Sequence, residues 1–177
     1  MPVSNHTYSK TSRFFLWLVL LGYLAVLTKL VVFKKPPGYI RRHLAGLYHH
    51  YNWKMVKANM DNGNFNIKPF ATIKMYLAAN MPAEYAISNL VGNVAGFIPL
   101  GILLPILFPR LGAAATIFTV FLFSLCFEIF QLFAMLGVCD IDDLLLNTLG
   151  GGIGYFFFWL AKKWMHSLQP KGFELKT

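Results

Sequence analysis

Four apolar stretches, each close to the length of a membrane-spanning helix, dominate this sequence. They cover residues 14–33, 87–108, 113–136 and 142–161. About 20 apolar residues carry a helix across the hydrocarbon core of a bilayer. Only 13% of the 177 residues are charged, against about 25% in an average soluble protein. The sequence therefore predicts an all-α integral membrane protein, with residues 1–177 as a single domain and a compact bundle of about four transmembrane helices.

Residues 34–86, between the first two stretches, form a polar region that we expect to lie at the membrane surface or to re-enter it. It begins with two lysines and two prolines, which end the first span. Further on, apolar side chains recur at helical spacing, at Leu44, Leu47, Tyr48, Tyr51 and Met55. Basic side chains flank this face, at Arg41, Arg42, Lys54 and Lys57. The pattern predicts one amphipathic interfacial helix, with a solvated loop helix as the alternative, and a short helix over residues 71–79 follows.

The formal net charge of +9 raises the question of what the chain binds. A basic chain can bind nucleic acid, but here Lys and Arg cluster beside the apolar stretches, as residues attracted to anionic lipid do. We therefore predict membrane lipids as partners and no nucleic acid, and we leave a homo-oligomer open. The two cysteines, Cys126 and Cys139, are expected to be free thiols because helical spacing would hold them too far apart for a disulfide.

Four of the seven acidic residues lie in one short segment, between Glu128 and Asp143. Each acid placed within a bilayer costs roughly 2.5–3.5 kcal/mol on insertion scales. With four spans, the start of the second, the end of the third and the start of the fourth lie on the same side of the membrane. Polar residues three or four apart on each of these helices share a face. The expected result is a polar pocket in that half of the bilayer, formed by Asn93, Glu128, Gln131, Asp140, Asp143 and Asn147.

Further residues are expected to support this pocket, namely Asn66, Pro69, Phe70, Asn89, Pro99 and Asp142. Structural roles are the alternative for some of them. Amides within spans often serve as hydrogen bonds between helices, which we favour for Asn89. Acids at the start of the fourth span can cap it, which suits Asp142 better than Asp143. Pairs of glycines four residues apart predict close helix packing, at Gly92, Gly96, Gly150 and Gly154.

Three blocks of the sequence resemble motifs of the VanZ-like family, named for a teicoplanin-resistance protein of Gram-positive bacteria. The first block is Asn66–Phe70, which is similar to an N-x-x-P-F motif, and the second is Asn93–Gly101, similar to N-x-x-x-F-x-P-x-G. The third contains Glu128-x-x-Gln131, the acids at 140–143 and Asn147–Gly151. The resemblance implies a multi-pass protein of the bacterial cell membrane, in the cell envelope, that lowers susceptibility to glycopeptides such as teicoplanin. Lipid-linked wall precursors or the glycopeptide itself would be its partners, and because these lie outside the cell we expect cytoplasmic termini.

Two other functions stay open at this point. An intramembrane enzyme acting on lipid-linked phosphate could hold Mg²⁺ through Glu128, Asp140 and Asp143, because carboxylates are the ligands that this ion prefers. A small proton-coupled carrier would use the buried acid and the proline-containing second span. No pair of nucleophile and base is visible in the sequence, so we assign no catalytic residue, and whether the protein is an enzyme stays open.

Overall fold

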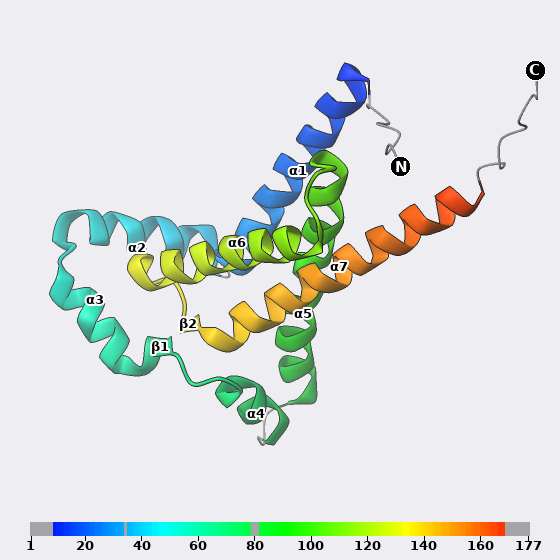
Figure 1. Cartoon of the computed structure of the whole chain (residues 1–177). Helices are drawn as coiled ribbons and strands as arrows, with labels where there is room; N and C mark the ends of the chain where they lie inside the picture. The colour runs from blue at the N-terminus through cyan, green and yellow to red at the C-terminus, as the bar shows by residue number, and fades with distance from the viewer. Residues whose placement is uncertain (1–8, 34, 79–81, 169–177) are drawn as a thin grey trace, which may run out of the picture.

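The computed structural model describes residues 9–33, 35–78 and 82–168. Four helices in this part of the chain are long and apolar enough to cross a membrane (Figure 1). They are α1 (Lys10–Val31), α5 (Ala83–Leu107), α6 (Ala113–Ala134) and α7 (Ile141–Ser167). The predicted class of an all-α multi-pass membrane protein is confirmed. The fourth helix runs beyond the predicted end at residue 161, because Lys162 and Lys163 are compatible with a helix and no glycine or proline interrupts it before Ser167.

The closest contact between helices is the crossing of α5 and α7. A Cβ added to Gly150 would lie 2.1 Å from the carbonyl oxygen of Val94, and one added to Gly154 would lie 2.1 Å from that of Ile98. Both distances are far below van der Waals contact, so the two backbones touch without intervening side chains. This is the arrangement that small residues permit in membrane helices.

The glycines that α5 contributes to this crossing differ from those predicted. Gly101 faces α7, where its added Cβ would lie 2.1 Å from the carbonyl oxygen of Gly151. A Cβ on Gly96 would instead contact Leu27 of α1 at 3.5 Å, and one on Gly92 would meet no described atom within 4 Å. The reason is the helical period: the face of α5 that meets α7 carries residues 94, 98 and 101, and Gly92 and Gly96 lie on other faces.

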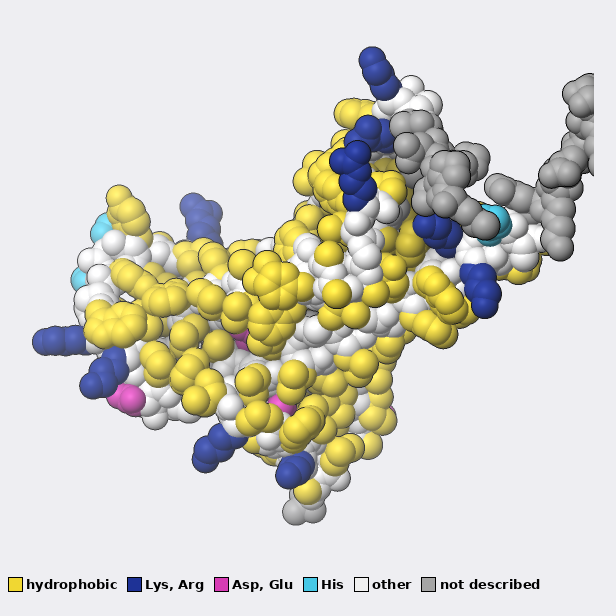
Figure 2. All heavy atoms as spheres, in the orientation of Figure 1, with side chains coloured by type: hydrophobic (Ala, Val, Ile, Leu, Met, Phe, Trp, Pro, Cys, Tyr) yellow, Lys and Arg dark blue, Asp and Glu magenta, His cyan; other side chains and the backbone are white. Residues whose placement is uncertain are grey.

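α1 packs against α5 and completes the apolar core. Leu27, Phe97 and Leu100 are almost fully buried there. The hydroxyl of Tyr23 donates a hydrogen bond to the carbonyl oxygen of Gly96 at 2.5 Å. Pro99 and Pro105 both lie inside α5, which continues through them. Hydrophobic side chains cover most of the visible face, as expected for a surface in contact with lipid (Figure 2).

The polar region contains two short helices where one was predicted. α2 (Pro37–His50) ends before Tyr51, and α3 (Trp53–Asn59) begins after Asn52. The side chain of Asn52 accepts a hydrogen bond from the backbone N–H of Met55 at 3.1 Å and so caps α3. A helix does lie between the first two spans, as predicted, but it ends before Tyr51 because the N-capping residue Asn52 starts a second helix. Of that face only Leu47 is buried, and Tyr48 is 85% exposed.

The rest of the polar region returns to the bundle. The π-helical turn η1 (Met60–Asn64) leads into the two-residue strand β1 (Phe65–Asn66). β1 pairs in parallel with β2 (Cys139–Asp140), with Asn66 opposite Asp140. The short helix α4 (Ala71–Ala78) follows and lies near the starts of α5 and α7 (Figure 1). It matches the short helix predicted over residues 71–79, whose last residue lies outside the described part of the chain.

Candidate functional site

Asp142 in the first turn of α7 is fully buried and binds the start of α4. One carboxylate oxygen accepts the backbone N–H of Phe70 at 2.5 Å. The other accepts the backbone N–H groups of Thr72 at 2.8 Å and Ile73 at 3.0 Å. The first N–H groups of a helix lack partners within it, and its positive dipole end favours an anion. Asp142 is thus a cap, but for α4 rather than for its own helix.

Asp140 caps α7 and also binds the polar region. Its side chain accepts the backbone N–H of Asp142 at 2.9 Å. The same oxygen accepts the side-chain amide of Asn66 at 3.2 Å, and the second oxygen accepts the hydroxyl of Thr72. Asp140 is only 6% exposed, and the protein around it provides these three donors.

Glu128 reaches this group from the last turns of α6. It is 2% exposed, and its carboxylate accepts the backbone N–H of Asp140 at 2.8 Å. Next to it, burial raises the pKa of the Cys139 thiol to about 11, and the charges of Glu128 and Asp140 act in the same direction. Cys139 therefore stays a thiol at neutral pH and is a poor nucleophile. Both cysteines are free, as predicted.

Asn93 and Asp143 join α5 to α7. The Asn93 amide donates to the Asp143 carboxylate at 2.6 Å. The two remaining residues of the predicted pocket point elsewhere: Asn147 donates to the hydroxyl of Ser124 on α6 at 2.8 Å, and Gln131 donates to the carbonyl oxygen of Val31 at the end of α1 at 2.8 Å.

The supporting residues take different positions around this group. Asn66 binds Asp140 directly, and its side-chain oxygen accepts the backbone N–H of Lys68 at 3.1 Å. Pro69 and Phe70 form the exposed connection between β1 and α4. Asn89 is half-buried one turn before Asn93 on α5.

Several side chains of the site could not be identified from spacing alone. Thr72 contacts both Asp140 and Asp142. The only sequence feature that points to it is its place two residues after the Asn66–Phe70 block. The polar region also supplies partners for the end of α6. The amide of Asn59 donates to the carbonyl oxygen of Leu132 at 3.3 Å. A ring nitrogen of His43 lies 3.0 Å from the carbonyl oxygen of Ala134.

The geometry does not favour a metal centre. In the described part of the chain, no three His, Cys, Asp or Glu side chains are grouped so that they could hold a metal ion. The suggested ligands Glu128, Asp140 and Asp143 are not assembled into such a group. Glu128 binds the backbone of Asp140, and Asp143 is engaged by Asn93. The carboxylates accept hydrogen bonds, which is how a protein retains buried polar groups.

Segments far apart in the sequence meet here through hydrogen bonds, at the end of the bundle that carries α4. We call it the acidic cluster and define it as Asn66, Thr72, Asn93, Glu128, Asp140, Asp142 and Asp143. Side-chain amides contribute three of its hydrogen bonds, from Asn66 to Asp140, from Asn66 to Thr72 and from Asn93 to Asp143. These hydrogen bonds hold β1 and α4 against α5 and α7.

Comparisons with known proteins identify relatives of this chain. A model of the VanZ/LLP1 family matches residues 20–162, which include every member of the acidic cluster. A protein of Enterococcus faecium described as Protein VanZ is 38% identical over 78 residues, which cover 44% of this chain and 48% of that protein. The matched part is thus about half the length of this relative. No solved structure matches the chain.

Proposed function

We propose that this chain, which belongs to the VanZ/LLP1 family, lowers the susceptibility of bacteria to glycopeptide antibiotics such as teicoplanin. It would act as a multi-pass protein of the cell membrane. The observation that carries the proposal is the convergence of the three family-like blocks on the acidic cluster. Three motifs that are separate in the sequence but meet in the folded protein support a shared function better than any one motif alone.

In this proposal the acidic cluster acts by positioning a surface. The carboxylates of Asp140 and Asp142 hold the connection between β1 and α4. That connection and α4 expose large apolar side chains, with Ile67 63%, Phe70 53% and Leu77 75% exposed. Lys68 and Lys74 lie among them and are exposed too. An apolar and basic surface of this kind suits a lipid-linked wall precursor, which combines a hydrocarbon chain with phosphate.

Teicoplanin susceptibility in a sensitive Gram-positive host tests the proposal. The host would express the wild type, Asp140→Asn, Asp143→Asn or Glu128→Gln at matched membrane levels. We expect the wild type to raise the minimum inhibitory concentration and the three variants to lose most of that protection. Asp61→Asn is the matched control, because Asp61 is exposed in η1, outside the cluster.

One outcome would contradict the resistance role, and another would contradict only the role of the acidic cluster in it. If the wild type gives no protection at a verified membrane level, this chain does not have the resistance role. If all variants protect as well as the wild type, the resistance role stands, but the acidic cluster is not the part of the protein that supports it.

A further inference from the structure

A groove between the end of α1 and the start of α2 combines an apolar floor with basic walls. Its volume is about 340 Å³, and it is lined by Lys29, Phe33, Lys35, Pro37, Ile40 and Arg41. The volume is at the lower end of the range of small-molecule sites. Phe33 and Ile40 are half-buried, whereas the three basic residues are exposed. The groove therefore offers a hydrocarbon contact with three cations beside it.

The cations of this groove have no acidic neighbour on the helices that form it. The first acidic residue of the chain is Asp61, so neither α1 nor α2 carries a carboxylate. The groove is thus electrostatically complementary to a negatively charged group.

The position of the groove indicates what kind of molecule carries that charge. Lys29 lies in the last turn of α1, where an apolar span ends. In a bilayer, the headgroups of the surrounding lipids lie at this level. A free phosphate ion would use the cations and leave the apolar floor exposed to water. A lipid uses both, because its phosphate meets the basic side chains while the upper part of an acyl chain covers Phe33 and Ile40.

We propose that this groove binds a phospholipid with two separated phosphates, of the cardiolipin type. Three basic residues from three segments line the groove: Lys29 on α1, Lys35 in the connection and Arg41 on α2. Their three positive charges match the two negative charges of such a lipid better than the single charge of a lipid with one phosphate. The inference does not depend on the antibiotic role.

The test is lipid binding to the full-length protein in detergent, measured by native mass spectrometry with cardiolipin, phosphatidylglycerol and phosphatidylcholine. The groove variant combines Lys29→Gln, Lys35→Gln and Arg41→Gln. The control variant combines Arg42→Gln, Lys54→Gln and Lys57→Gln, which removes the same charge from exposed residues that do not line the groove. We expect cardiolipin to be retained preferentially by the wild type and the control, and the groove variant to bind it about tenfold more weakly or worse.

Other results would overturn the inference. Equal losses in the two triple variants would show general charge attraction instead of a site. Retention of phosphatidylcholine as strong as that of cardiolipin, or displacement of cardiolipin by an equal concentration of inorganic diphosphate, would exclude the proposed occupant. If the groove variant does not fold, as judged by circular dichroism, Arg41→Gln and Arg42→Gln make the same comparison with neighbouring residues.

Discussion

Asp142 provides acceptors for three backbone N–H groups at the start of α4 and is fully buried. Each of these donors would otherwise be removed from water without a partner, at a cost of about 1–3 kcal/mol. The fixed position of α4 therefore depends on a side chain about 70 residues away in the sequence. At the scale of the residue, buried acids in this protein act first as hydrogen-bond acceptors that hold the fold.

We predict that Asp142→Asn releases α4. Asparagine keeps one oxygen but places an NH₂ group against backbone donors, so at least one hydrogen bond is lost and α4 is destabilised by about 1–3 kcal/mol. Hydrogen exchange of residues 70–78 should then be faster, while exchange in α6 stays unchanged. Asp61→Asn is the control, and unchanged exchange of residues 70–78 in Asp142→Asn would show that Asp142 does not hold α4.

At the scale of the element, the contact between α5 and α7 rests on backbone proximity at glycines. Gly150 and Gly154 lie against carbonyl oxygens of α5, whereas Gly92 meets no described atom within 4 Å of an added Cβ. The two kinds of glycine are indistinguishable by spacing, since both form pairs four residues apart. Only the packing of the helices shows which glycines lie at the contact between α5 and α7.

We therefore expect opposite results from the same substitution at two glycines. Gly150→Ala forces a Cβ to within 2.1 Å of the Val94 carbonyl oxygen, so the helices must separate, at a typical cost for overpacking of about 1–3 kcal/mol or more. Gly92→Ala should be neutral or slightly stabilising, because alanine favours a helix and space is available. Thermal unfolding in detergent measures both, and a normal melting temperature for Gly150→Ala would contradict the close crossing.

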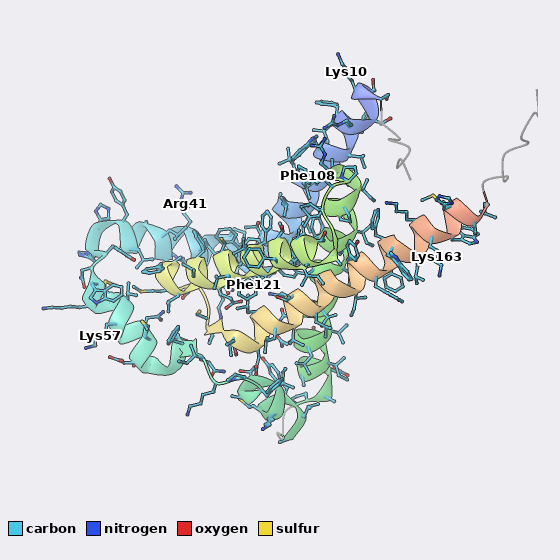
Figure 3. The ribbon with its side chains drawn as sticks, viewed as in Figure 1. Lys10, Arg41, Lys57, Phe108, Phe121 and Lys163 are labelled. Atoms are coloured by element: carbon cyan, nitrogen blue, oxygen red, sulfur yellow. The ribbon has the colours of Figure 1, made fainter. Side chains whose placement is uncertain are left out.

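At the scale of the whole molecule, the topology separates two groups of basic residues. Lys10, Phe108 and Lys163 mark the end of the bundle where α1 begins, α5 ends and α7 ends (Figure 3). Arg41 and Lys57 lie on α2 and α3, in the polar region on the other side (Figure 3). Basic residues are present on both sides, so the positive-inside rule does not decide which one faces the cytoplasm.

If the proposed function is right, the side carrying the polar region faces outward, toward wall precursors and antibiotic. We predict that Lys57→Cys, in a background with Cys126→Ser and Cys139→Ser, reacts with a membrane-impermeant maleimide in intact cells. Arg110→Cys, in the turn between α5 and α6, should react only after lysis. Labelling of Arg110→Cys in intact cells and of Lys57→Cys only after lysis would show the opposite orientation.

The sequence by itself determined the class of the protein, the four spans and the gathering of the polar residues at one end of the bundle. These follow from the length of apolar runs and from helical period, which are local properties. It also indicated Asn93, Glu128, Asp140 and Asp143 as parts of one cluster, because an even number of spans returns their helix ends to the same side. The number of spans and the helical period are sufficient for that prediction.

Only the tertiary structure decided what these residues contact. Asp142 caps α4 instead of its own helix, Gln131 and Asn147 bind other helices, and Asn52 divides the predicted surface helix in two. The strand pair β1–β2 has two residues in each strand, too few for a pattern in the sequence. The physical reason is common to all of them. A hydrogen-bonding side chain can satisfy several partners equally well, and the choice depends on which backbone groups the packed helices bring within about 3 Å.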